Sequence, residues 1–377
     1  MNIPEKWERP LTPATVEDLR VMAMHAALLT SSDSLANVIG ELGFIQYDPI
    51  RRPARAQDLI LHQRVGGYRR GDLERRYGKL GLEEGFFYIY GAMTPELYRL
   101  LHPRRDRRRP DEAYQPSGLA AEVLAVVREQ GPTHPRSLEK QFGRTRAVNG
   151  WGGFSAATTR ALEQLHYHGL LRIAYREAGV KVFAATESLL HDLSEAERHR
   201  TLTLRLARVL APVREGSLRG ALNQLGRYGG VKIEHDSAVA QLLASNRLSE
   251  TTIGGARYLW PTEISSSHPK DVTQRVRFLA PFDPAVWDRA RFEQLWGWAY
   301  RFEAYTPAEK RQFGYYALPM FWGDRAIGWV NCEIEDGKLT VERQFAMRPL
   351  RGKRFEASFD REVSRLERML GLSEPAT

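Results

Sequence analysis

The tripeptide Gln46-Tyr47-Asp48 combines an amide and a carboxylate in a segment that reads as a short strand ended by a proline. Side chains alternate along a strand, so Gln46 and Asp48 are predicted to project from one face while Tyr47 packs on the other. A carboxylate beside an amide can hold a water molecule and take its proton, as a general base does in hydrolysis. The simpler interpretation is that both polar groups face solvent beside a buried tyrosine.

The arginines that follow this tripeptide favour the chemical interpretation. Arg51, Arg52 and Arg55 come soon after Asp48, and the planar guanidinium group suits phosphate. A carboxylate next to a phosphate-binding surface is a candidate hydrolytic site. From sequence alone, any of the three arginines is as well suited to pairing with Asp58 or another acid.

The overall charge makes nucleic acid the first partner to test. The chain of 377 residues carries 55 Lys and Arg against 46 Asp and Glu, a formal charge of +9, and only nine of the cations are lysines. Eight arginines lie in 51–76, and five more fall in the window 104–109. Prolines around that window favour a solvated linker, which can also lie along a phosphate backbone.

The single cysteine, Cys332, cannot form an internal disulfide, a tetracysteine zinc site or a four-thiolate iron–sulfur cluster. We therefore expect neither a metal nor a cofactor.

No apolar run approaches the roughly 20 residues that cross a bilayer, and the first residues lack the apolar segment of a signal peptide. We expect a cytoplasmic protein without a membrane partner.

Helix and strand signals predict repeated helical modules. Residues 113–196 give the pattern most fully, with three helices followed by two strands that a short turn joins. Three helices and a β-hairpin are the layout of a winged helix, whose third helix usually enters a DNA groove. The same order is predicted for 197–271. Residues 1–112 show a helix, a second helix and then the strand with Gln46.

Residues 272–377 shift toward aromatic residues, strands and turns, and six of the eight tryptophans lie at or beyond Trp260. This composition predicts an antiparallel β unit closed by an amphipathic helix at 355–370, with Trp287, Trp296 and Trp298 in the core. The expected fold is mainly α with β, with three tandem winged-helix domains (1–112, 113–196, 197–271) followed by a C-terminal antiparallel β-barrel-like domain (272–377).

The sequence resembles a known family, the winged-helix DNA glycosylases that unhook interstrand crosslinks, which comprise YcaQ-like and AlkZ-like proteins. The resemblance rests on LGFIQYDPI at 42–50, on Ala-Arg-Ala at 54–56 and on LAPFDPAVWDRARFEQLWGWAYRFEAYTPAEKRQFGYYALP at 279–319, and it covers nearly the whole chain. The glutamine-x-aspartate form is similar to the YcaQ branch, whereas the AlkZ branch carries glutamine at the second polar position.

The resemblance implies three winged helices and a β-barrel wrapped around duplex DNA, with Gln46 and Asp48 as the catalytic pair. It also suggests that a basic hairpin meets the minor groove, and Lys310 and Arg311 lie in that region. Ordinary surface cations on a barrel rim are the alternative for these two residues. The remaining candidate DNA contacts follow the catalytic segment: Arg51, Arg52, Arg55 and Gln57.

One departure from the family pattern concerns an aromatic-x-His segment that many members carry where this chain has Phe87-Tyr88-Ile89. The missing histidine bears on substrate range more than on reaction type, and it indicates a divergent subfamily.

A single carboxylate suits a leaving base that is already activated. Alkylation of guanine at N7 gives the base a positive charge, so it leaves without protonation and no general acid is needed. Asp48 would orient water and take its proton, and Gln46 would hold the same water or the deoxyribose. The lysine nearest in sequence is Lys79, so no nucleophile for a lyase step is evident.

These arguments predict a monofunctional DNA glycosylase that acts as a monomer on double-stranded DNA with alkylated bases. Its substrates would be cationic N7-alkylated purines, with interstrand crosslinks as further candidates. The alternative, from a different class, is a non-catalytic winged-helix transcriptional regulator. Such a regulator would prefer one DNA sequence and release no base.

Overall fold

A computed structural model of the chain describes residues 13–104, 114–143, 145–148, 154–186, 189, 191–266 and 272–372. Contacts within the chain divide it into two compact units. The first unit combines residues up to 72 with 199–221 and with the chain from 234 onward, and the second combines 73–198 with 222–233. The arginine-rich window predicted as a linker falls almost entirely outside the described residues, which include Arg104 but not 105–109.

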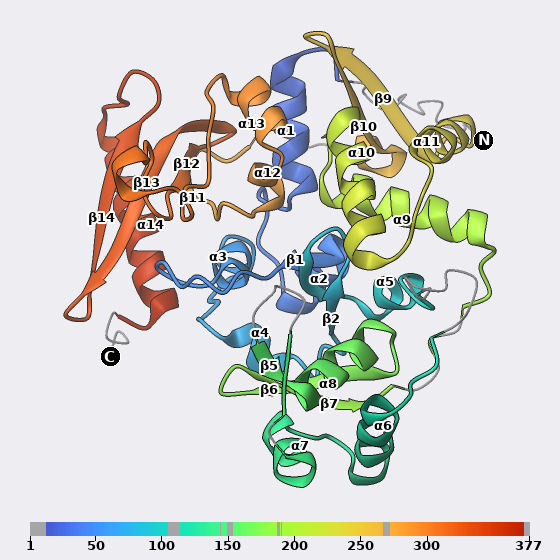
Figure 1. Cartoon of the computed structure of the whole chain (residues 1–377). Helices are drawn as coiled ribbons and strands as arrows, with labels where there is room; N and C mark the ends of the chain where they lie inside the picture. The colour runs from blue at the N-terminus through green and yellow to red at the C-terminus, as the bar shows by residue number, and fades with distance from the viewer. Residues whose placement is uncertain are drawn as a thin grey trace, which may run out of the picture. The chain divides into compact units, whose positions relative to one another are not determined.

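The first unit opens with helices whose ends follow local sequence signals (Figure 1). Helix α1 (Val16–Ala26) begins at Thr15, which forms a capping box with Asp18. Ser34 caps α2 (Leu35–Leu42), and Gly43 ends it in the left-handed conformation with a φ of 68°. The chain then turns directly into β1 (Phe44–Gln46), and α3 (Ala56–His62) follows after a loop.

The middle of the chain contains the three helices and the hairpin predicted for 197–271. Strand β8 joins the hairpin in a sheet of order β8-β10-β9. The elements are α9 (Glu195–Val209), β8 (Val213–Arg214), α10 (Glu215–Gln224), α11 (His235–Ala244), β9 (Leu248–Ile253), β10 (Ala256–Pro261) and the 3₁₀ turn η2 (Thr262–Ser266).

The C-terminal part of the first unit is an antiparallel sheet of order β11-β12-β13-β14, curled into half a barrel (Figure 1). The last helix, α14, packs on β11 and matches the predicted amphipathic helix. The elements are β11 (Val276–Phe278), α12 (Pro284–Trp287), α13 (Arg289–Trp296), the 3₁₀ turn η3 (Ala308–Lys310), β12 (Leu318–Trp322), β13 (Arg325–Glu335), β14 (Lys338–Phe345) and α14 (Lys353–Leu370).

One apolar core joins the N-terminal helix to this sheet. Four elements bury side chains in it: Leu19 of α1, Trp260 of β10, Trp296 of α13 and Phe321 of β12. Trp298 packs against it. Because each element contributes an apolar face to the same cluster, burial of this area fixes α1 against the barrel. The prediction that Trp296 belongs to the core is confirmed, whereas Trp298 is partly buried against that core and Trp287 is half-buried and is not among its residues.

The second unit contains the other predicted set of three helices and a hairpin. Its own core gathers Val123 of α6, Leu138 of α7, Leu162 of α8 and Phe183 of β7. The elements are α4 (Asp72–Arg76), β2 (Glu83–Phe86), β3 (Tyr90–Met93), α5 (Pro95–Leu100), α6 (Leu119–Gln130), α7 (Pro135–Phe142), β4 (Arg146–Val148), β5 (Phe154–Ala156), α8 (Ala157–Tyr167), β6 (Leu171–Glu177), β7 (Val180–Ala185) and the π-helical turn η1 (Leu225–Gly229).

Among the helices in the described ranges, none combines the length and the hydropathy that a bilayer crossing requires.

Candidate active site

Asp48 lies just beyond the end of β1, in the loop that leads to α3. The strand ends at Gln46, so the predicted alternation of side chains does not extend to Asp48. Its Oδ1 atom accepts a hydrogen bond of 2.9 Å from the backbone N–H of Ile50. Within the described part of the chain, no arginine or lysine forms an ion pair with this carboxylate. The neighbouring arginines therefore leave its charge available.

Partial burial raises the pKa of Asp48 above its ordinary value, against the lowering effect of the hydrogen bond from Ile50. A carboxylate with a raised pKa accepts a proton more readily than an exposed one. A half-buried carboxylate without a paired cation among the described residues suits a general base.

Gln46 is buried at the end of β1, with 7% of its surface exposed. Its Oε1 atom has no hydrogen-bond partner among the described residues. A buried acceptor without a partner costs about 1–3 kcal/mol. Such an atom is a candidate for binding water or substrate.

A cleft of about 430 Å³ opens in the first unit beside the sheet. Arg52, Arg311, Tyr315 and Tyr316 line it together with residues of β13 and β14. Two of the predicted DNA contacts, Arg52 and Arg311, are thus brought to one cleft although they are far apart in the sequence.

The loop that carries Arg311 and the two tyrosines is held by a buried carboxylate. Oε2 of Glu303 accepts hydrogen bonds from the backbone N–H groups of Gln312 (2.9 Å) and Phe313 (2.7 Å). Asn331 of β13 donates to the carbonyl of Phe313 at 2.9 Å. Gly314 has a φ of 118°, and a Cβ there would collide with the Asn331 side chain. Only glycine fits this loop.

Both cleft arginines lie over one aromatic ring. The guanidinium carbon of Arg311 is 5.1 Å from the ring centroid of Tyr315, and that of Arg52 is 5.8 Å away. Arg52 also lies 4.0 Å from Glu333, in an ion pair whose side chains are more than half exposed. Exposed pairs of this kind are weak, so a phosphate can compete with Glu333 for Arg52.

The other predicted DNA contacts differ in exposure. Arg51 and Lys310 are exposed, and Arg55 is half-buried at the start of α3. Lys310 belongs to the turn η3 beside the cleft but is not among the residues that line it. Gln57 is only 2% exposed. Its burial in α3 argues against the predicted contact with DNA.

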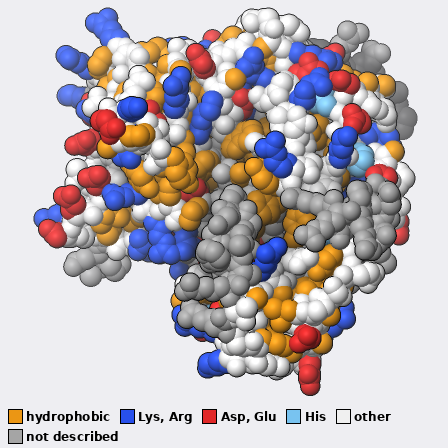
Figure 2. Space-filling model, viewed as in Figure 1, with side chains coloured by type: hydrophobic (Ala, Val, Ile, Leu, Met, Phe, Trp, Pro, Cys, Tyr) orange, Lys and Arg blue, Asp and Glu red, His pale blue; other side chains and the backbone are white. Residues whose placement is uncertain are grey.

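Charge on the sheet is mixed and does not form a uniformly basic surface. Figure 2 shows basic and acidic side chains next to one another over β13 and β14, and Glu333 and Glu342 lie among the cleft residues. Arginine contacts are therefore local to the cleft.

Most of the cleft residues were not predicted as part of a site, among them Tyr316 and Cys332. Tyr316 is 4% exposed, and its hydroxyl has no hydrogen-bond partner among the described residues. Cys332 also lines the cleft, and burial raises the pKa of its thiol to about 12. The thiol stays protonated at neutral pH and is a poor nucleophile. The run that contains Tyr316 resembled the family, but only burial singles out its hydroxyl.

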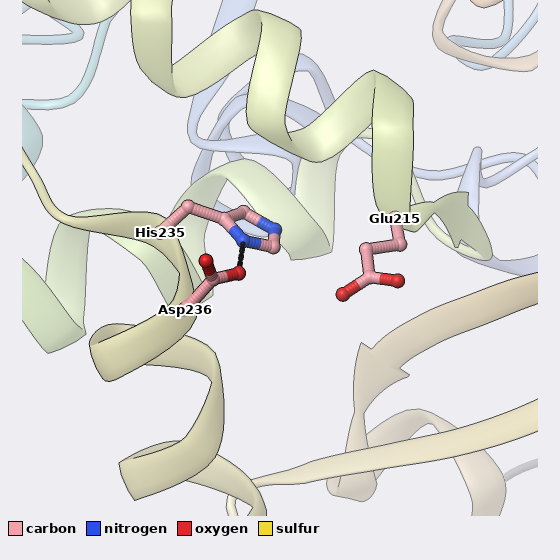
Figure 3. Close-up of side chains that lie close together, drawn as sticks. All are labelled: Glu215, His235 and Asp236. Atoms are coloured by element: carbon pink, nitrogen blue, oxygen red, sulfur yellow. Dashed lines mark hydrogen bonds and ion pairs between the residues drawn. The ribbon is translucent and has the colours of Figure 1, made fainter.

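A second group of titratable side chains lies at the starts of α10 and α11. Figure 3 shows Nδ1 of His235 bonded to the Asp236 carboxylate, with Glu215 facing them. Three potential metal-ligand atoms of these residues lie within 4.8 Å of one another. Arg257 pairs with Glu215 at 2.9 Å and Arg219 with Asp236 at 2.8 Å, so the carboxylates are already neutralised. Ion pairing explains this cluster without a cation.

Comparison with known proteins identifies the class. A family model described as DNA glycosylase AlkZ-like matches residues 39–369. This chain therefore belongs to the AlkZ-like family of DNA glycosylases, enzymes of DNA repair that hydrolyse the bond between base and sugar. Among solved structures, it is similar to the DNA glycosylase AlkZ of Streptomyces sahachiroi. The TM-score is 0.61 at 15% sequence identity, over 96% of this chain and 98% of the other.

Proposed function

We propose that this glycosylase releases cationic N7-alkylated purines from double-stranded DNA, with Asp48 as the general base and Gln46 as the residue that holds the attacking water. The observation that carries the proposal is the half-buried Asp48, free of any arginine or lysine partner in the described ranges, next to a buried Gln46 whose Oε1 is unpartnered. A base and an acceptor for one water molecule are what such a hydrolysis needs.

In the proposed reaction, water attacks the anomeric carbon of the deoxyribose while the bond from that carbon to purine N9 breaks. The electron pair of this bond moves to the base and neutralises its positive charge, so no proton donor is required. Asp48 takes the proton that the water loses. The ionised carboxylate also stabilises the positive charge that develops on the sugar. The products are an abasic site and the neutral alkylated base.

We infer a monofunctional enzyme, because no lysine is among the residues described as lining the cleft. The buried thiol of Cys332 is also unsuited to attack on the sugar.

The DNA contacts that we propose are Arg52 and Arg311 in the cleft, with Arg51, Arg55 and Lys310 as further backbone contacts. Guanidinium groups over an exposed tyrosine ring remain free to turn toward a phosphate. Interstrand crosslinks are further candidate substrates. Crosslinked DNA would test whether the absence of histidine at Phe87-Tyr88-Ile89 narrows the range of substrates.

We also propose that three winged helices, at 1–112, 113–196 and 197–271, precede the β domain at 272–377. Two sets of three helices followed by a hairpin support the second and third modules. In the third, β8 adds the extra strand that a winged helix places beside its hairpin. We expect the protein to act as a monomer in the cytoplasm.

The test is release of base from duplex DNA that carries N7-methylguanine. Base and abasic sites are counted for the wild type, Asp48→Asn and Gln46→Ala. We expect a loss of about 10³-fold or more for Asp48→Asn, because its amide cannot take the proton, and about 10- to 100-fold for Gln46→Ala. Asp236→Asn is the matched control, since it makes the same change in an exposed ion pair and should stay near the wild-type rate.

Wild-type activity that persists in both Asp48→Asn and Gln46→Ala would remove these residues from the reaction. The regulator alternative is tested by the same samples. It predicts tight binding to one DNA sequence, with no base released from any alkylated duplex by the wild type.

A further inference from the structure

We propose that the hydroxyl of Tyr316 donates a hydrogen bond to the attacking water and so positions it between Asp48 and Gln46. This inference rests on the proposed function, because it assigns a further residue to the same reaction.

Tyr316 combines a fixed ring with an unused hydroxyl. Phe302 packs edge-on against its ring with centroids 5.4 Å apart, and Phe282 does so at 6.4 Å. The ring thus packs against a pair of phenylalanines that also contact each other, with centroids 4.9 Å apart. Its hydroxyl is buried without a hydrogen-bond partner among the described residues, and Tyr316 lines the 430 Å³ cleft. A buried, unpaired donor on a residue that lines a cleft suits a ligand-binding role.

Tyr316 also lies within electrostatic reach of the base. Burial raises the pKa of Tyr316 well above its ordinary value, and the negative charge of Asp48 is the next cause of that shift. The hydroxyl therefore keeps its proton at neutral pH. Tyr316 cannot act as the base, and its proton remains available for a hydrogen bond.

The hydrogen-bonding capacity of one water molecule matches these groups. Water donates two hydrogen bonds, and the acceptors at hand are the Asp48 carboxylate and the unpartnered Oε1 of Gln46. It accepts one hydrogen bond from Tyr316, which leaves its other lone pair for the anomeric carbon. Tyr316 and Asp48 do not hydrogen-bond directly to each other in the described structure, which leaves both groups available to a water molecule.

The first experiment compares Tyr316→Phe with the wild type under saturating N7-methylguanine duplex. Phenylalanine keeps the ring contacts and removes only the oxygen. We expect kcat to fall about 10- to 100-fold, because one positioned donor is lost, while KM and DNA affinity stay within about twofold. Tyr258→Phe is the matched control. Tyr258 is fully buried in β10, and its hydroxyl is equally unpartnered in the described structure. It belongs to the apolar core that includes α1, and it is not among the residues that line the cleft.

A double-mutant cycle with Gln46→Ala provides a readout that a merely structural role would not move. If Tyr316 and Gln46 hold the same water, the fold-loss of kcat in the combined variant is smaller than the product of the fold-losses in the two single variants. Losses that multiply would overturn the inference, as would Tyr316→Phe turning over at the wild-type kcat. Both results leave the proposed function in place as long as Asp48→Asn is inactive. The proposed function itself fails if wild-type protein releases no base.

Discussion

The region of Asp48, Gln46 and Tyr316 and the cluster of Glu215, His235 and Asp236 both gather polar side chains, but they differ in whether these side chains already have partners. In the cluster, arginines neutralise both carboxylates, and among its described atoms only Nε2 of His235 is buried without a hydrogen-bond partner. In the region of Asp48, in contrast, the carboxylate has no ion pair within the described ranges, and two buried polar atoms there, of Gln46 and Tyr316, have no hydrogen-bond partner.

This difference shows that spacing alone does not identify a reactive site. Paired charges hold α10, α11 and β10 together, and they have little capacity left for a ligand. Unpaired buried polar groups cost about 1–3 kcal/mol each, so such groups in the region of an unpaired carboxylate are candidates for binding a ligand. By this criterion the region of Asp48, Gln46 and Tyr316 is the candidate for catalysis, and the cluster is structural.

The largest effect that would separate the two regions is the pH dependence of catalysis. The proposed base must be ionised, so kcat/KM should fall about tenfold per pH unit below the pKa of Asp48. Burial raises that pKa, so the acid limb should have its midpoint above 3.8, the ordinary aspartate value. Base release is measured from pH 4 to 9 with spontaneous depurination subtracted. A rate that stays level throughout this range would remove Asp48 as the base. Asp236→Asn should leave the limb where it is.

A smaller effect is expected for the cleft arginines, which we assign to binding. Arg52→Gln and Arg311→Gln should each weaken DNA affinity several-fold and reduce the slope of log K against log salt by about 0.9. The kcat at saturating DNA should stay unchanged. Glu333→Gln should have the opposite effect and raise the affinity for DNA, because it frees Arg52 from its acidic neighbour.

The matched control for these variants is Arg343→Gln on β14. Its guanidinium pairs with Glu356 at 2.7 Å and lies over the Phe359 ring of α14. Equal salt slopes for the wild type and Arg52→Gln would show that Arg52 does not contact phosphate.

Local signals made much of the fold predictable from the sequence. The cap at Ser34, the left-handed Gly43 and the turns between hairpin strands depend on neighbouring residues only, and the structure confirms the elements that they bound. The tripeptide at 46–48 was found in the same way. Its strand was predicted two residues too long, because the alternation rule carries no information about where pairing stops.

What the sequence could not provide are partners that are distant along the chain. Arg64 belongs to the eight arginines at 51–76 that contributed to the expectation of a nucleic-acid partner. Instead it is buried and makes two hydrogen bonds, of 2.8 and 2.9 Å, to Asp283, which is 219 residues away. A buried pair of this kind is structural. Neither composition nor spacing distinguishes Arg64 from Arg52, which is exposed in the cleft.

Tyr316 was missed for the same reason. Its position in an aromatic run indicates a core residue, and most of the run is core. Only the tertiary arrangement shows that its hydroxyl is unpaired and that Asp48 is near.

The smallest effect is expected in the cluster, where Asp236→Asn and treatment with EDTA should both leave base release within about twofold of the wild type, as for other exposed ion pairs. Hydrogen bonds from Arg219 and His235 lower the pKa of Asp236 to about 2. A lowered carboxyl pKa stabilises the folded state above the ordinary pKa, and this stabilisation is lost as the pH falls toward 2. Asp236→Asn should therefore lower the melting temperature slightly at neutral pH, and the difference should shrink in acid. If EDTA instead lowers the melting temperature of the wild type but not of Asp236→Asn, the cluster holds a cation that displaces its arginines, and the contrast with the cleft fails.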